Sequence, residues 1–244
     1  MEYALFRPGV VLAALAGALA LVLSLPASAQ LRFGGSVGVV SDYVYRGYSR
    51  SRGEPAVQAG AQWSDRRWAI GAWASSVELQ PRRRSGELDL FAQRRVPLTD
   101  DLDAGIGLTW YSFPGDPRAV SYDYGELSGS LDWRQRLHLE LAYSPNLTLF
   151  GAYYGVQRSR ESWTAELTVT QPLPWELSAF TGVGHFAVPQ VRGAGYTYGS
   201  IGLSRDVGRW HAELTYFRSG DGASRLYSFG PDGGPLVASV SWHF

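Results

Sequence analysis

Apolar and polar side chains alternate with a period of two along most of the chain, the pattern of β-strands that present one face to an apolar environment. The last nine residues show it most clearly, because Leu236, Val240 and Phe244 share one face and Ser239 and His243 lie on the other. The same alternation predicts twelve strands, at residues 31–45, 55–64, 67–78, 87–96, 102–113, 123–133, 136–145, 162–171, 176–186, 196–206, 210–218 and 236–244.

The connections between the predicted strands alternate in length. The short ones are residues 65–66, 97–101, 134–135, 172–175 and 207–209, and the long ones are 46–54, 79–86, 114–122, 146–161, 187–195 and 219–235. Short turns at one end and long loops at the other are typical of outer-membrane barrels. We therefore predict an all-β chain that forms a single antiparallel transmembrane β-barrel of about twelve strands, with both termini at the short-turn end.

Two alternatives to this topology stay open. Residues 146–158 could form a strand of their own, but an odd total would separate the termini, so we interpret them as a loop or as an extension of the neighbouring strands. Fourteen strands is the second choice. A soluble β-sandwich shows the same alternation, but it would not need an apolar outer face with carboxylates on the opposite face.

The strand periodicity places the acidic residues inside the barrel, because a carboxylate that faces lipid costs a few kcal/mol. Residues 137–143 illustrate the rule, with leucines on one face and His138 and Glu140 on the other. The carboxylates predicted to line the lumen are Asp42, Asp89, Asp103, Glu126, Asp132, Glu140, Glu166 and Glu213. Few arginines share that face, among them Arg32, Arg46 and Arg95, so the lumen is predicted to favour cations weakly.

The terminal stretch resembles the closing strand of outer-membrane barrels, which ends on an aromatic residue and pairs with the first strand. This resemblance implies an assembly signal made of Leu236, Val240, Trp242 and Phe244, and a barrel-assembly machinery as a partner. The other end of the chain carries an apolar run, 9–25, followed by Ala27-Ser28-Ala29, the pattern of a helical signal peptide cleaved before Gln30. The predicted domains are thus a signal peptide, 1–29, and a barrel, 30–244, exported to the outer membrane of a Gram-negative cell.

Composition narrows the possible functions. Removing residues 1–29 leaves 22 − 1 = 21 basic and 22 − 1 = 21 acidic groups, and this neutral balance argues against a nucleic-acid partner. Cysteine is absent, which excludes thiolate metal sites and disulfides. His138, His185, His211 and His243 lie on different strands without a ligand-spaced partner, so we predict no metal, no cofactor and no catalytic residues.

The stretch 41–60, SDYVYRGYSRSRGEPAVQAG, carries a resemblance to a known family. In Ser41, Asp42, Tyr43, Arg46 and Gly47, followed by Ser49, Ser51 and residues 55–58, it resembles the TorF family of porin-type proteins, also described as Gcw_chp-type outer-membrane proteins. Further similar segments follow in order at residues 73–77, 87–90, 111–115, 124–127 and 143–145. The resemblance implies a porin-like barrel and leaves the transported solute open.

The first loop leaves two interpretations open. Strand parity places Asp42 and Arg46 inside, where they could line the mouth of the lumen or form an ion pair that fixes the loop; Tyr43 and Tyr45 would then face outward. Arginines, Arg50 among them, are expected on the outer surface in the long loops, and Arg82, Arg83 and Arg84 are predicted to face lipopolysaccharide phosphates.

The function predicted from these features is passive passage of small ions or solutes through a narrow pore, with outer-membrane lipids as surroundings. The alternatives are a structural or adhesive barrel without an open pore and, less favoured, a lipid-modifying outer-membrane enzyme that would use His185 on the lipid face.

Overall fold

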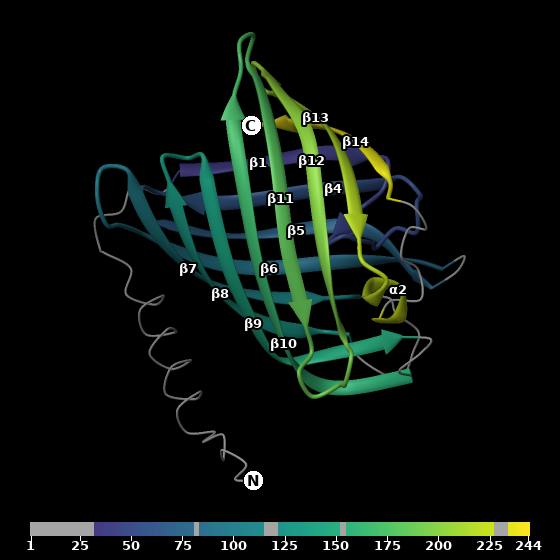
Figure 1. Ribbon diagram of the computed structural model, residues 1–244. Helices are drawn as coiled ribbons and strands as arrows, with labels where there is room; N and C mark the ends of the chain where they lie inside the picture. The colour runs from purple at the N-terminus through teal and green to yellow at the C-terminus, as the bar shows by residue number, and fades with distance from the viewer. Residues whose placement is uncertain (1–31, 81–82, 115–121, 152–154, 227–233) are drawn as a thin grey trace.

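The computed structural model describes residues 32–80, 83–114, 122–151, 155–226 and 234–244. Twelve antiparallel strands close into one barrel, in which each strand pairs with its neighbours in sequence and the last pairs with the first (Figure 1). The barrel strands are β1 (Arg32–Val40), β4 (Ala56–Ser64), β5 (Trp68–Gln80), β6 (Arg83–Pro97), β7 (Leu102–Ser112), β8 (Tyr124–Trp133), β9 (Leu137–Gly151), β10 (Gly155–Pro172), β11 (Leu177–Ala187), β12 (Gly195–Val207), β13 (Trp210–Ser219) and β14 (Leu236–His243).

The prediction of twelve strands in a single barrel is confirmed, and most strand limits lie within two residues of the predicted ones. Two predicted long loops are largely strand instead: β5 and β6 continue to Gln80 and from Arg83, and β9 and β10 continue to Gly151 and from Gly155. Residues 146–151 and 155–158 thus extend the neighbouring strands. The backbone ladder continues here although the side-chain alternation fades, because hydrogen bonding between strands does not require an apolar face.

Short turns connect the strands at the opposite end. Arg134 and Gln135 both have positive φ angles, 53° and 56°, as do Trp175 and Glu176, 62° and 59°. Consecutive positive φ angles are typical of the type I′ turn, whose twist matches that of the strands it joins. These turns fix the register of the β8–β9 and β10–β11 hairpins, and the C-terminus lies at this same end (Figure 1).

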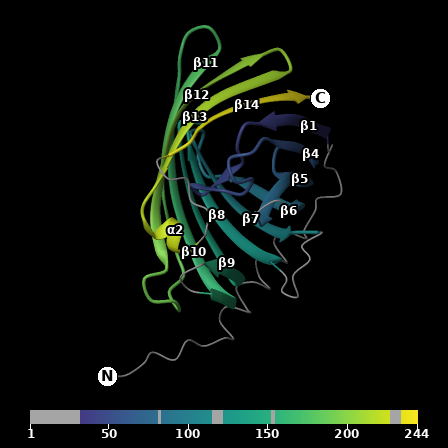
Figure 2. The ribbon, with the colours of Figure 1, turned by 90° about the vertical axis from the view of Figure 1, so that its right-hand side faces the viewer.

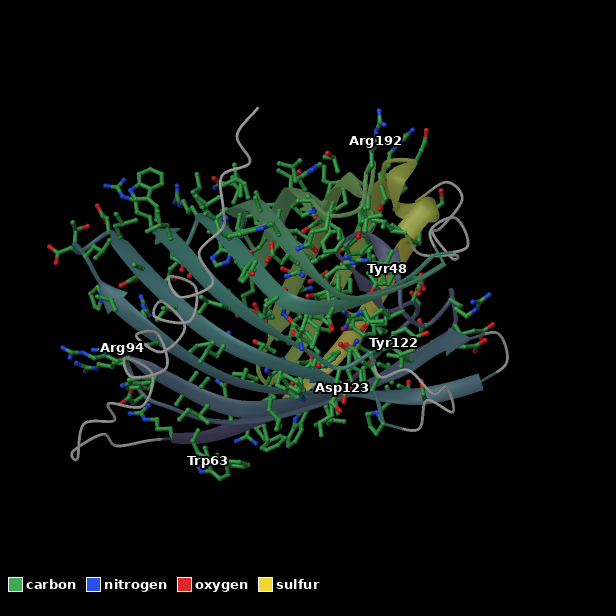
Figure 3. The ribbon with its side chains drawn as sticks, turned by 90° about the horizontal axis from the view of Figure 1, so that it is seen from below. Tyr48, Trp63, Arg94, Tyr122, Asp123 and Arg192 are labelled. Atoms are coloured by element: carbon green, nitrogen blue, oxygen red, sulfur yellow. The ribbon has the colours of Figure 1, made fainter. Side chains whose placement is uncertain are left out.

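The outer face of the barrel is apolar. Phe33, Val57, Val183, Ile201 and Leu236 each expose more than half of their surface. Near the short turns, Trp63 projects away from the wall (Figure 3), and Trp133, Trp175 and Trp210 are also exposed, whereas Trp68 is buried with the Arg94 guanidinium over its ring. Such an apolar band with aromatic residues near its edge is typical of lipid-exposed barrels.

The closing strand joins the first strand as predicted. Strands β1 and β14 pair in antiparallel register from Ser36↔His243 to Val40↔Ser239. Beyond that ladder, the backbone of Phe244 exchanges two hydrogen bonds with Gly35, of 3.0 and 3.1 Å. The Phe244 ring lies 6.2 Å from that of Phe33 and 5.4 Å from that of Trp242, measured between ring centroids. The last residue is therefore an integral part of the seam.

The hydrophobic core lies inside the barrel, at the end that carries the long connections. It includes Val77, Leu149, Phe186 and Leu226, each at most 2% exposed. Leu226 belongs to the short helix α2 (Gly222–Leu226), which contacts β9 and β12 (Figure 1). Among the described residues, no helix is both long and apolar enough to span a bilayer. The interior is thus filled at the long-loop end and polar toward the short turns.

Candidate functional site

The first loop, residues 41–55, folds into the barrel rather than away from it, and we call it the plug. It contains two short paired strands, β2 (Val44–Tyr45) and β3 (Tyr48–Ser49). Figure 2 shows this purple hairpin inside the wall, and Tyr48 lies within the barrel in Figure 3. Strand β1 therefore ends at Val40, five residues before the predicted limit at 45, because the chain turns inward there.

The sequence of the plug explains its local shape. Arg46 and Gly47 have φ angles of 48° and 75°, which makes them the two central residues of a tight hairpin turn. At its base, the Asp42 carboxylate accepts hydrogen bonds from Ser49 Oγ (2.5 Å), Ser51 Oγ (2.9 Å) and the Gly53 amide (3.2 Å). One buried carboxylate thereby ties together both halves of the loop.

The tip of the plug packs against strands β12 and β13. A Cβ atom at Gly47 would collide with the side chains of Tyr198 and Ser219, so only glycine fits this approach. Ser219 donates a hydrogen bond to the Gly47 carbonyl, and Tyr196 Oη donates one to the Arg46 carbonyl at 2.9 Å. The hairpin thus projects inward from β1 and contacts β13 and β12, which are two and three strands away from β1 in the barrel.

Arg46 fixes the plug to strand β8. Its two terminal nitrogens each donate a 2.8 Å hydrogen bond to the Glu126 carboxylate, and both side chains are more than nine-tenths buried. Two parallel bonds between a guanidinium and a carboxylate are the strongest form of this pair. Tyr111 donates to the same carboxylate at 3.4 Å and accepts a hydrogen bond from Tyr45 at 3.2 Å.

Arg50 makes a second buried ion pair, with Glu87 on β6. The Arg50 guanidinium also donates hydrogen bonds to Tyr48 Oη (3.0 Å), Tyr43 Oη (3.3 Å) and Tyr124 Oη (3.1 Å). Burial raises the pKa of Tyr43, although the Arg50 charge acts in the opposite direction, so its hydroxyl stays protonated and donates to Glu87 at 3.4 Å.

Aromatic rings enclose the Arg50 guanidinium. Its central carbon lies 3.7 Å from the centroid of the Tyr45 ring, and the rings of Phe113 and Tyr111 lie 5.5 and 5.8 Å away. Cation–π attraction at these distances is strengthened by the exclusion of water. Both ends of the plug hairpin are therefore fixed to the wall by buried arginines.

The plug region carries more buried carboxylates than buried arginines. Asp89, two residues along β6 from Glu87 and cross-strand from Tyr111, is 8% exposed. Its Oδ1 atom and the Oε2 atom of Glu87 are buried without a hydrogen-bond partner among the described residues. Arg46 and Arg50 thus lie near three buried carboxylates of the wall, Glu87, Asp89 and Glu126, and Asp42 is a fourth, within the plug.

A polar vestibule lies between the plug and the short turns. Its volume is about 220 Å³, and its polar lining residues are Gln93, Arg94, Arg95, Ser128, Ser130, Asp132, His138 and Glu140, together with strand glycines. Asp132 Oδ1 lies 2.6 Å from His138 Nδ1. The vestibule wall therefore combines small residues that leave space with two carboxylates, Asp132 and Glu140, and two arginines, Arg94 and Arg95.

The remaining predicted lumen carboxylates lie on the inner face with different partners. Asp103 pairs with Arg95. Glu166 accepts a 2.6 Å hydrogen bond from Tyr198, and Glu213 accepts one of 2.5 Å from Thr215. Glu140 lies directly cross-strand from Glu166. Arginine therefore neutralises only some of the lumen carboxylates.

Several predictions for the first loop are wrong. Tyr43 and Tyr45 are packed inside the barrel rather than facing outward, because the chain leaves the wall at Ser41. Asp42 and Arg46 do not pair with each other, since each has other partners. Arg50, expected among the outer-surface arginines, is 2% exposed inside the lumen. Glu87 was overlooked, although it has the same strand parity as Asp89.

The predicted lipopolysaccharide contacts lie at the β5–β6 connection. Arg82 is outside the described residues, and for Arg83 and Arg84 only the backbone, in β6, is described. The hairpin that carries them extends beyond the barrel wall at the long-loop end (Figure 1).

The histidine considered for lipid chemistry does face outward. His185 is exposed, and its Nδ1 atom lies 3.0 Å from Thr197 Oγ1 on the neighbouring strand. Its described partner is thus a threonine rather than a serine, and no carboxylate contact to it is described. In the described part of the chain, no group of three or more histidine, aspartate and glutamate residues could hold a metal ion.

Comparisons with known proteins show which solved structures and which family this chain is similar to. No curated protein matches the chain. Among solved structures, the chain is similar to a structure described as "KdgM porin", with 9% identity and a TM-score of 0.55 over 86% of this chain and 99% of that one. It is also similar to the COG4313 outer membrane channel from Pseudomonas putida F1, with 12% identity and a TM-score of 0.53 over 90% and 99% of the two chains. Residues 25–238 match the family described as "Bacterial protein of unknown function (Gcw_chp)", and the chain belongs to that family.

Proposed function

We propose that this protein is a TorF-type porin of the Gram-negative outer membrane, a narrow passive pore for small ions or solutes whose opening depends on the plug. The observation that carries the proposal is the lumen itself: a polar, carboxylate-lined vestibule on one side, and on the other a hairpin held to the wall chiefly by side chains. Twelve strands enclose more space than the eight of a side-chain-filled barrel and less than the sixteen of an open porin.

The charges of the lumen support a weak preference for cations. Asp89, Asp132, Glu140, Glu166 and Glu213 face inward without a described arginine pair, whereas Arg46, Arg50 and Arg95 are each paired with a carboxylate. Carboxylates that line a constriction attract cations, and they are screened less by salt than exposed loop charges are.

Replacing Asp132 and Glu140 by their amides should reduce this preference. Planar-bilayer recordings in a tenfold salt gradient should give a reversal potential of cation-selective sign for the mature wild type. The double variant Asp132→Asn with Glu140→Gln should shift it toward zero, because two vestibule charges are removed without touching the plug.

Asp100→Asn is the matched control, since Asp100 is exposed in a short turn outside the lumen. A reversal potential that stays unchanged in the double variant would remove these two residues from the selectivity mechanism.

The filled outer half of the lumen favours one second candidate, a structural or adhesive barrel without an open pore. A single measurement distinguishes the two functions, because a structural barrel should show no channel events even after the plug is removed.

The apolar outer face and the closing strand support outer-membrane localisation, export by the signal peptide 1–29 and assembly by the barrel-assembly machinery.

Lipopolysaccharide is the proposed partner of the β5–β6 hairpin. Changing Arg82, Arg83 and Arg84 to Gln should lower the apparent melting temperature by a few °C in lipopolysaccharide-containing micelles, because guanidinium–phosphate pairs are lost. In plain detergent the same variant should melt like the wild type.

The control is Arg66→Gln with Arg67→Gln, two exposed arginines in a short turn at the opposite end. Equal destabilisation of the triple variant in both media would reject the lipopolysaccharide contact.

A further inference from the structure

We propose that the barrel wall around Arg50 is a binding site for organic cations that carry a guanidinium group, and that Arg50 occupies this site from within the chain. The inference deepens the proposed pore function, on which it rests, by naming the class of solute. The site around Arg50 is made of residues from two parts of the molecule, the wall and the plug.

The wall supplies half of the Arg50 site without any contribution from the plug. Glu87 comes from β6, Tyr111 from β7 and Tyr124 from β8. The rings of Tyr111 and Tyr124 are stacked, with centroids 4.4 Å apart and planes inclined by 13°. A buried carboxylate beside stacked aromatic rings, with Phe113 next to them, is an environment that attracts planar cations.

Arg50 enters this environment as an occupant rather than as part of the wall. It is anchored in the plug, whose backbone leaves the barrel sheet between Val40 and Ala56. Its guanidinium pairs with Glu87 and donates to Tyr124 Oη at 3.1 Å. A solute guanidinium could make the same contacts, because they come from wall residues.

The wall also has carboxylate oxygens that neither Arg46 nor Arg50 binds. Asp89 Oδ1 and Glu87 Oε2 are buried and have no hydrogen-bond partner among the described residues. With Arg46 paired to Glu126 and Arg50 to Glu87, the Asp89 charge has no arginine of its own. A buried carboxylate without a counter-charge is costly, so an added cation is favoured here and an anion is repelled.

Chemical rescue tests the site directly. Arg50→Ala leaves a guanidinium-sized space and an unpaired Glu87, and we expect a loss of roughly 10 °C in the apparent melting temperature of the mature protein in detergent. Methylguanidinium at about 10 mM, ten times a dissociation constant of the order of 1 mM, should restore roughly a third to a half of that loss. Methylammonium should restore less, because it cannot form two parallel hydrogen bonds.

Two control variants test whether the rescue by methylguanidinium depends on the Arg50 site. Arg95→Ala removes an arginine from a half-exposed pair with Asp103, and methylguanidinium should not rescue it. The double variant Arg50→Ala with Glu87→Gln should also gain nothing, because the wall carboxylate is gone. Equal stabilisation of all three variants would show a solvent effect and overturn the inference.

A second measurement uses the unaltered protein, in case Arg50→Ala does not fold. Agmatine, which carries a guanidinium group, should change the ion current of the wild type in a saturable manner, and Glu87→Gln should weaken that response at least about tenfold in concentration, as expected for the loss of a charged hydrogen bond. An agmatine response identical in the two proteins would overturn the inference. Silent wild-type and plug-deleted barrels would instead reject the proposed pore, while rescue of unfolding could still be measured.

Discussion

Removing the plug should raise the single-channel conductance of this barrel by about threefold or more, because the hairpin occupies the lumen and a twelve-stranded barrel encloses more space than the eight-stranded barrels that side chains fill. The fold offers a clean way to do so. Val40 and Ala56 are register partners, so residues 41–55 can be replaced by a two-residue Asn-Gly turn that joins β1 directly to β4. Planar-bilayer recording of the mature protein measures the effect.

A point variant tests the anchor of the plug, the Arg46–Glu126 ion pair, while the plug itself stays in the chain. Glu126→Gln removes the carboxylate that receives two hydrogen bonds from Arg46 and leaves a buried guanidinium unpaired, a change that costs about 3–5 kcal/mol. The plug should then leave the lumen more often, seen as more frequent large openings. Asp103→Asn, which breaks the half-exposed pair with Arg95, is the control. If the plug-deleted barrel conducts no better than the wild type, the plug is not the barrier.

Loss of the last residue should leave most of the protein unassembled in the periplasm. Deleting Phe244 removes the two backbone hydrogen bonds to Gly35 and the ring contact with Phe33 at the seam where the barrel closes. The seam has only a short ladder, five register pairs between β1 and β14, so these contacts are a large fraction of it. Fractionation and heat-modifiable gel migration would measure the assembled fraction.

The matched control is Phe33→Ser, which removes the aromatic partner but keeps the terminal residue and the backbone ladder. We expect Phe33→Ser to assemble with a lower melting temperature and Phe244→Ser to assemble poorly. Normal outer-membrane levels of the Phe244 deletion would show that the terminal residue is dispensable for assembly.

The structure of the plug gives a physical role to the residues at 41–60 that resemble the family. Asp42, Ser49 and Ser51 form the hydrogen-bond network at its base, Gly47 allows the close approach to β12, and Arg46 anchors the tip. The family-like stretch is thus the segment that fills the lumen.

The sequence by itself determined the barrel. Period-two alternation identified the strands and their faces, since lipid and lumen select opposite side chains at every second position. Leu214 outside and Glu213 inside illustrate the rule on β13. The alternation of connection lengths then favoured twelve strands over fourteen, and the aromatic residue at the end of the terminal strand indicated the closing strand. These features are local, so a single chain displays them directly.

Only the tertiary structure decided what fills the barrel. Residues 41–49 alternate like a strand whether they continue the wall or turn into the lumen, because both conformations are extended. The inward path is selected by contacts between residues distant in sequence, 80 positions apart for Arg46 and Glu126 and 37 for Arg50 and Glu87. An arginine that is exposed in a loop and one that is buried in an ion pair look identical in the sequence, and only the partner distinguishes them.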